Sequence, residues 1–311
     1  MSLTDLIQSG EDANAVGQAM LLAQALMDGP PEAGPRTYCY TTPRSVNSKS
    51  EPFGARFGVR GVGVISADRR LHAAILQYSS DAPLTPEPLA QVQDLHSAVR
   101  YAIRGGFEAV ANAMVVRISE PELQAAPGDA VSAALKGTAG VQLNWGSGLD
   151  GILTAGHVGK SSGIKATVAG ASGSVVLALD PTNHGASPEA DVSVIQLPSA
   201  VPATSRITST TTAGPGDSVT IATRSGTSVS ATIMGQMQWL WLPKSSCTCG
   251  HVYMTTKYVT SQGDSGAPVR KGGDLIGHVI AASVGMTTYI QLIDYQLQEI
   301  KRNAAFSAAN L

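Results

Sequence analysis

Charge, aromatic residues and cysteine are all scarce in this 311-residue chain. Charged residues make up 14% of it and the formal net charge is -2, so we expect no basic surface for nucleic acid. Aromatic residues contribute only 5% and glycine is frequent, a composition that suits short strands joined by tight turns. No apolar run approaches the roughly 20 residues that a membrane-spanning helix needs. The composition therefore predicts a protein rich in β-structure, with neither nucleic acid nor a membrane as partner.

The few cysteines and the N-terminal residues both bear on the cellular compartment. Cys39, Cys247 and Cys249 are an odd number and cannot form a complete set of disulfides. A secretory signal needs a positive segment before its apolar core, whereas acidic residues precede the first apolar stretch, 19–27. These features favour a reducing compartment, and we predict a cytoplasmic protein.

The order of the predicted elements divides the chain into two domains. The first part contains a helix, a hairpin, a second helix and a strand, at 9–28, 56–78, 86–104 and 114–118. The second part alternates short apolar segments with turns, as antiparallel barrels or sandwiches do, and ends in a helix at 294–302. We predict a small α+β domain of unassigned function over 1–127, with a linker at 120–129, and a mainly β domain over 128–311.

Three short motifs contain the residues that nucleophilic catalysis requires. Ser265 lies in Gly-Asp-Ser-Gly, where its own N–H and that of Gly263 can point at a developing oxyanion. A serine hydroxyl needs a base, and the base works best when a carboxylate orients it. His157 follows an apolar run and Asp191 begins an alternating strand. We predict that His157, Asp191 and Ser265 form a catalytic triad, and that Gly263 and Ser265 form the oxyanion hole.

The chain order His157, Asp191, Ser265 resembles that of the chymotrypsin-like (trypsin-fold) serine peptidases, over about residues 130–311. The resemblance, closest to bacterial-type members, implies two six-stranded antiparallel β-barrels, an active site between them and a C-terminal helix. It places His157 and Asp191 on the first barrel and Ser265 on the second. It also implies peptide-bond hydrolysis through an acyl-enzyme, without a cofactor.

Asp264, beside the nucleophile, is a buried acid in that family and needs a partner there. No Ile-Val-Gly-Gly-like sequence occurs at 125–141, so we do not expect a new N-terminus to supply it. Arg224 lies in a turn that resembles the arginine-bearing hairpin of some bacterial members. We therefore consider an Arg224–Asp264 ion pair that supports the site, with a solvated hairpin arginine as the alternative.

The resemblance also assigns a substrate pocket to Val259, Thr260, Ala282 and Ser283. Because no aspartate lies at its base, we expect a small or apolar side chain at the cleaved position and not arginine or lysine. His278 is one position out of register with the pocket histidine of glutamate- or glutamine-preferring relatives. One residue of a strand reverses the face, so a histidine facing elsewhere is favoured over a pocket residue.

Cys247, Cys249 and His251 offer three soft ligands within five residues. The cysteines are closer together than in common zinc sites, and no second ligand pair follows. We therefore expect a loop with reduced thiols and no metal. Val158, where many secreted relatives carry a cysteine, agrees with a reducing compartment.

Two hypotheses about function follow. The first is an intracellular serine endopeptidase that acts on protein or peptide substrates, with residues 1–127 regulating it, recruiting substrate or docking a partner protein. The alternative is a trypsin-fold interaction module whose catalysis is dispensable. The complete set of His157, Asp191, Ser265 and Gly263 favours the enzyme, because a binding module has no need of it.

Overall fold

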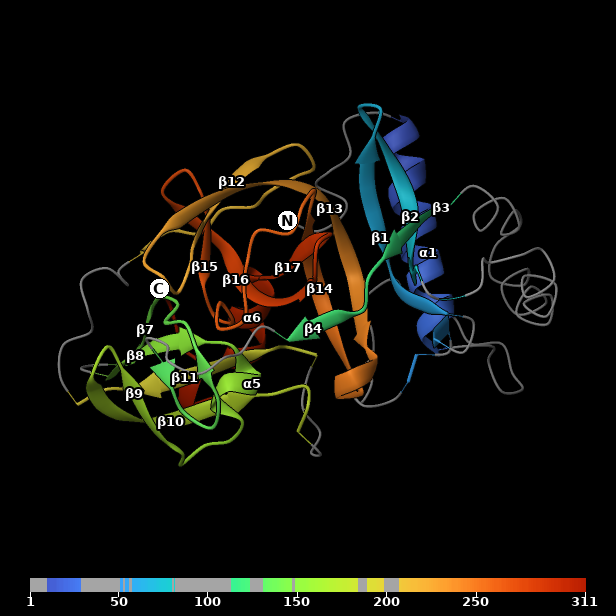
Figure 1. Cartoon of the computed structure of the whole chain (residues 1–311). Coiled ribbons are helices and arrows are strands. Elements are labelled where there is room, and N and C mark those ends of the chain that lie inside the picture. Colours follow the sequence, from blue (N-terminus) through green and yellow to red (C-terminus); the bar gives the residue numbers. More distant parts are fainter. Residues whose placement is uncertain are drawn as a thin grey trace.

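The computed structural model describes residues 10–28, 51–52, 54–55, 58–79, 81, 113–123, 131–146, 149–183, 189–198 and 207–311. The helix predicted at 86–104 and Cys39 lie outside these residues. Within them, none of the helices combines the length and apolar character that crossing a bilayer requires. The described chain is mainly β-structure, drawn in Figure 1 as two curled sheets, one of them extended by a helix-backed layer.

The C-terminal half forms a closed ring of six antiparallel strands, as expected. The strands are β12 (Ser218–Ala222), β13 (Ser228–Leu242), β14 (Cys247–Thr255), β15 (Pro268–Lys271), β16 (Asp274–Ser283) and β17 (Thr287–Leu292). Their order is β12-β15-β16-β17-β14-β13, and a β12–β13 pairing closes the ring. Buried residues alternate along β12, as one inward face requires. We call this ring the second barrel.

The other sheet contains seven antiparallel strands, one more than expected. In spatial order β6-β5-β9-β10-β11-β8-β7, they are β6 (Lys136–Gly137), β5 (Val131–Ser132), β9 (Lys165–Val168), β10 (Ala171–Leu179), β11 (Val192–Gln196), β8 (Leu149–Thr154) and β7 (Gln142–Gly146). The extra member, β6, is only two residues long. A one-turn helix, α5 (Gly156–Gly159), follows β8. We call this sheet the first barrel.

A shared apolar core joins the two barrels. It combines first-barrel residues such as Leu143 and Leu153 with Leu275 of the second barrel and Ile300 of helix α6 (Ile293–Lys301). The short helix η5 (Ala304–Phe306) packs against this core. The ring centroids of Phe306 and Trp145 are 5.1 Å apart. A second short helix, η4 (Pro243–Ser245), connects β13 to β14. The predicted C-terminal helix is confirmed, and it packs where the barrels meet.

The N-terminal elements extend the sheet of the second barrel. Strands β1 (Val59–Ala67) and β2 (Arg70–Tyr78) form the predicted hairpin, and β3 (Met114–Ile118) lies parallel to β2. β1 pairs with the half of β13 that β12 leaves free, between Gly235 and Leu240. Helix α1 (Gly10–Asp28) covers the outer face of this layer, as Figure 1 shows. The domain boundary at residue 127 stays a prediction.

One further strand lies in the segment predicted as a linker. β4 (Pro121–Leu123) pairs antiparallel with the last three residues of β16. The pairs are Leu123 with Ala281, Glu122 with Ala282 and Pro121 with Ser283. The first residues of this segment therefore occupy a sheet edge of the second barrel.

Candidate active site

The structure brings His157, Asp191 and Ser265 into one hydrogen-bonded chain. The Oγ of Ser265 lies 2.8 Å from Nε2 of His157, and Nδ1 of the same ring lies 2.7 Å from Oδ2 of Asp191. The N–H of His157 donates to the other carboxylate oxygen at 2.8 Å. His157 is 1% exposed and the other two residues are 0% exposed. The arrangement brings a hydroxyl, an imidazole and a carboxylate together in the order that nucleophilic catalysis by a serine requires.

Tight packing around α5 explains how His157 is placed. Gly156 precedes it, and a Cβ added there would collide with the carbonyl oxygen of Leu179. Only glycine fits this close approach of two backbones. The turn that follows carries His157 inward to Asp191, which directly precedes β11.

The turn around Ser265 contains two glycines in the left-handed region. Gly263 has φ +98° and Gly266 has φ +86°. The first barrel holds this turn, because Thr138 donates its N–H to the carbonyl of Ser265 at 2.7 Å and its hydroxyl to that of Gly263 at 2.6 Å. On the other side, Gly266 N–H donates to Val279 of β16 at 2.8 Å. Ser265 therefore lies between the two barrels.

Asp264 is buried, 1% exposed, and both of its carboxylate oxygens accept hydrogen bonds. Oδ2 accepts the N–H of Ser261 at 2.8 Å and its hydroxyl at 3.2 Å. Oδ1 accepts the backbone N–H of Arg224 at 2.8 Å. The guanidinium Nη1 of Arg224 lies 3.5 Å from the carbonyl of Gln262. The structure thus brings Arg224 to Asp264 through its main chain, while the ion pair stays a prediction.

Three of the four predicted pocket residues, Val259, Thr260 and Ala282, meet at Thr288 of β17, which the sequence analysis missed. Thr288 Oγ1 lies 2.9 Å from the hydroxyl oxygen of Thr260 and accepts the N–H of Val259 at 3.3 Å. Thr288 is also the partner of Ala282 across the β16–β17 ladder. Ser283 is next along β16 and is bonded elsewhere: its hydroxyl donates to the carbonyl of Ser119 at 2.7 Å. Ala282 and Ser283 are both 0% exposed.

His278 lies in the interface between the barrels. Its Nδ1 is 2.8 Å from Oε1 of Gln296 on α6, and burial lowers its pKa to about 4. A Cβ on Gly140 of the first barrel would lie 2.6 Å from its Nε2. This placement agrees with the favoured interpretation of a strand histidine that faces away from the pocket.

Two glutamines that no motif identified contact the main chain of Asp191. Gln291 Oε1 accepts its N–H at 2.7 Å, and Gln296 Nε2 donates to its carbonyl at 3.2 Å. One signal could have indicated Gln291: it is a polar residue between the apolar neighbours Ile290 and Leu292 in a predicted strand. Such an interruption needs a buried hydrogen-bond partner.

The loop predicted for Cys247 and Cys249 is wrong. Both residues belong to β14 and pair with Leu242 and Leu240 of β13. They are fully buried with free thiols, because this end of β14 faces an apolar core. His251 contacts the ring of Tyr295 at 4.6 Å between centroids, and burial lowers its pKa to about 4. Within the described ranges, no group of three or more potential ligands gathers for a metal.

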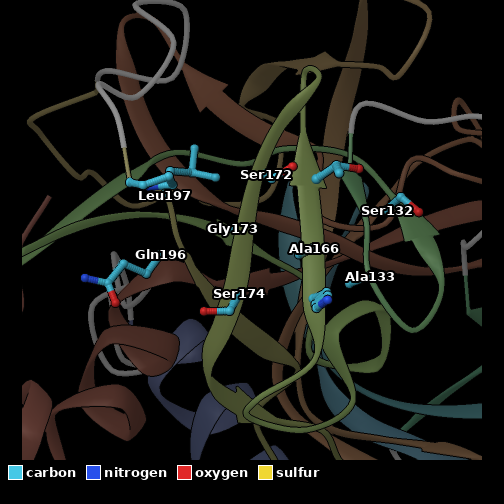
Figure 2. A pocket seen from close by; sticks show the side chains of 11 residues that line it. Ser132, Ala133, Ala166, Ser172, Gly173, Ser174, Gln196 and Leu197 are labelled. Carbon is cyan, nitrogen blue, oxygen red and sulfur yellow. The ribbon is translucent and has the colours of Figure 1, made fainter.

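A separate hollow of about 840 Å³ lies on the first barrel. Figure 2 shows it over the β9–β10 hairpin, beside Gln196 and Leu197 at the end of β11. Its lining mixes polar residues such as Ser132 and Gln196 with apolar ones such as Ala166 and Leu197, and it includes none of the residues of the hydrogen-bonded chain. This hollow is therefore separate from the chain of hydrogen bonds that joins Ser265, His157 and Asp191.

Neither protein-family models nor curated proteins match this chain. The solved structures to which this chain is similar include bacterial serine proteases. Nocardiopsis protease is 20% identical, with 57% of this chain and 97% of that chain covered and a TM-score of 0.43. Cellulomonas bogoriensis chymotrypsin is 21% identical, with 55% and 92% covered and a TM-score of 0.42. Thermobifida fusca protease A is 23% identical, with 51% and 86% covered and a TM-score of 0.41.

Proposed function

We propose that this chain is a serine endopeptidase with His157, Asp191 and Ser265 as its catalytic triad. The observation that carries the proposal is the unbroken hydrogen-bonded chain from Ser265 Oγ through the His157 ring to Asp191. Ser265 would attack the scissile carbonyl while its proton passes to Nε2 of His157. Asp191 holds the ring in the required tautomer and stabilises the imidazolium that forms. His157 then protonates the leaving amine, and water hydrolyses the acyl-enzyme.

The oxyanion hole is assigned to the N–H groups of Gly263 and Ser265. Within the described part of the chain, neither group donates to a protein acceptor. The positive φ of Gly263 supports the role, because other residues adopt this conformation only at a cost. Losing one such donor costs about 2.7–4 kcal/mol of transition-state stabilisation.

The substrate is a protein or peptide under this proposal, with a small or apolar side chain at the cleaved position. Val259 and Ala282 support this preference, because both are apolar and both contact or pair with Thr288. Thr260 and Ser283 add only hydroxyl groups. An intracellular, cytoplasmic location stays a prediction from the cysteine content.

We further propose that the N-terminal part regulates access to the site. β4 covers the edge of β16 at Ala281–Ser283, and the β16 residue Val279 is bonded to the turn of the nucleophile. An extended peptide binds such an edge by adding a strand. Because β4 runs antiparallel to β16, Leu123 is its member nearest to Val279. β4 therefore has the place and direction of a substrate strand whose C-terminal end leads toward Ser265.

We call residues 119–123, which include β4, the strap. Contacts of the two residues before β4 also hold it in place. Ser119 accepts from Ser283 and donates its own hydroxyl to the carbonyl of Val284 at 3.0 Å. Glu120 Oε2 lies 3.3 Å from Nζ of Lys244. With Ser265 0% exposed, these contacts support a closed form in which the strap must leave before substrate binds. Docking of a partner protein on residues 1–127 stays a prediction.

Labelling with a fluorophosphonate probe tests the proposed chemistry. We expect the folded protein to form a covalent adduct at Ser265 and to cleave members of a peptide library, with Ser265→Ala as the control that does neither. Failure to label, even when the strap is loosened, would contradict the enzyme and support the interaction-module alternative. Sequencing the cleaved products would measure the side-chain preference directly.

A further inference from the structure

Two glutamines of the C-terminal half hold the main chain of Asp191, which lies in the first barrel. Gln291 belongs to β17 and accepts the N–H of Asp191 at 2.7 Å, whereas Gln296 belongs to α6 and donates to its carbonyl at 3.2 Å. Both glutamines are 0% exposed. Both main-chain groups of Asp191, the N–H and the carbonyl, are thus hydrogen-bonded to side chains that do not belong to the first barrel.

Gln291 also fastens the segment before Asp191 to the second barrel. Its Nε2 donates to the carbonyls of Glu189 and Gly250, each at 2.9 Å. The N–H of Gly250 in turn donates to the carbonyl of Glu189 at 3.0 Å. One amide side chain therefore joins the segment 189–191 to strand β14 by three hydrogen bonds.

His278 determines the orientation of Gln296. Its Nδ1 contacts Oε1 of Gln296 at 2.8 Å, which leaves the Nε2 of the glutamine to face Asp191 and Oε1 of Gln291. A neutral ring that donates from Nδ1 fits this carbonyl acceptor. The ring itself is fully buried against Gly140. The direction of the Gln296 amide is therefore set by its surroundings.

We propose that Gln291 and Gln296 are positioning residues that align the two halves of the triad across the barrel interface. Both carboxylate oxygens of Asp191 bond to His157, so a shift of Asp191 moves the imidazole with it. The His157–Ser265 contact crosses from one barrel to the other, and its 2.8 Å length depends on that alignment. The inference rests on the proposed peptidase function. It adds two positioning residues that lie outside the three motifs of the sequence analysis.

The test compares Gln291→Met with a matched control, Gln236→Met. Gln236 is also a buried glutamine of the second barrel, 1% exposed, and its amide has no hydrogen-bond partner in the structure. Fluorophosphonate titration counts the folded sites, and peptide hydrolysis then yields kcat and KM for each site. We expect Gln291→Met to lower kcat about tenfold to a hundredfold, as a displaced catalytic group does. KM should stay within about twofold, because no pocket residue changes.

A spectroscopic readout separates positioning from general stability. The proton between Nδ1 of His157 and Asp191 is expected to give a low-field proton resonance in wild type, and Gln291→Met should shift or broaden it while Gln236→Met should not. If Gln291→Met does not fold, Gln296→Met removes the other contact to Asp191 and takes its place. Unchanged kcat per site together with an unchanged resonance overturns the positioning role alone. A protein that neither labels nor hydrolyses peptides, even when the strap is loosened, overturns the peptidase function and the inference with it.

Discussion

Replacing Glu122 by proline should open the edge of β16 that β4 covers. Ser283 directs its main chain toward β17, because its carbonyl accepts the N–H of Met286 at 2.9 Å in the hairpin turn. Adjacent residues of a strand direct their main-chain groups to opposite edges. Those of Ala282 therefore face Glu122, its partner in β4. Proline has no N–H, so Glu122→Pro removes one donor from this pair.

The expected magnitude follows from the contacts of the strap. One backbone hydrogen bond contributes about 1 kcal/mol net, which is about fivefold in the ratio of closed to open forms. The Glu120–Lys244 pair contributes at most about 1 kcal/mol, because its side chains are 37% and 56% exposed. We expect Glu122→Pro to accelerate fluorophosphonate labelling of Ser265 about fivefold. Glu122→Ala keeps the N–H and should label at the wild-type rate.

Hydrogen exchange at the Ala282 amide provides the structural readout, and it should become faster in Glu122→Pro and stay at the wild-type rate in Glu122→Ala. The charge reversal Glu120→Lys should accelerate labelling about twofold to fivefold, and adding Lys244→Glu should restore the wild-type rate. Equal labelling rates in wild type and Glu122→Pro, with faster exchange at the β16 edge, would refute the reasoning. In that case the edge opens without controlling access to the nucleophile.

Three other changes test the support of the site. Gly156→Ala should abolish labelling and lower the melting temperature, because its methyl would collide with a main-chain carbonyl, whereas Gly273→Ala, with open space around it, should match wild type. Arg224→Pro should slow peptide hydrolysis far more than Arg224→Ala, because only proline removes the N–H that Asp264 accepts; a larger loss in the alanine variant would favour the ion pair instead. Burial lowers the pKa of His278 to about 4 from an ordinary 6.5, so the stability that its neutral ring contributes is full above pH 6.5 and is lost as pH falls toward 4. Thermal melts should show a loss of up to about 3 kcal/mol across that range, reduced in His278→Gln; an equal loss in the variant would assign the effect to other groups.

Local sequence was sufficient to identify the residues of the hydrogen-bonded chain. Ser265 and His157 lie in short motifs whose glycines are required by the backbone itself, as the collision at Gly156 illustrates. Alternating apolar residues predicted the strands, since each barrel strand buries one face. The C-terminal helix followed from the same periodicity. These predictions succeeded because each depends on residues close together in the chain.

The features that the sequence analysis missed all depend on contacts between distant segments. Cys247 and Cys249 were assigned to a loop, yet pairing with β13 makes the whole segment a strand. The bond from Gln291 to Asp191 joins residues 100 positions apart. β4 contains only three residues and begins with proline, so only the free edge of β16 makes it a strand. A local pattern contains no information about such partners.

The strap and the two glutamines have different roles in the proposed reaction: the strap limits access of substrate, and the glutamines align Asp191. The chain from Ser265 to Asp191 is complete, with both contacts of the His157 ring at or below 2.8 Å, although none of the Ser265 surface is exposed. In a latent enzyme with an unformed site, the hydrogen bonds of His157 to Ser265 and Asp191 would be absent. Here Gln291 keeps the acid aligned while β4 covers the neighbouring sheet edge. Activation would therefore require removal of the strap from β16 and no rebuilding of the catalytic groups.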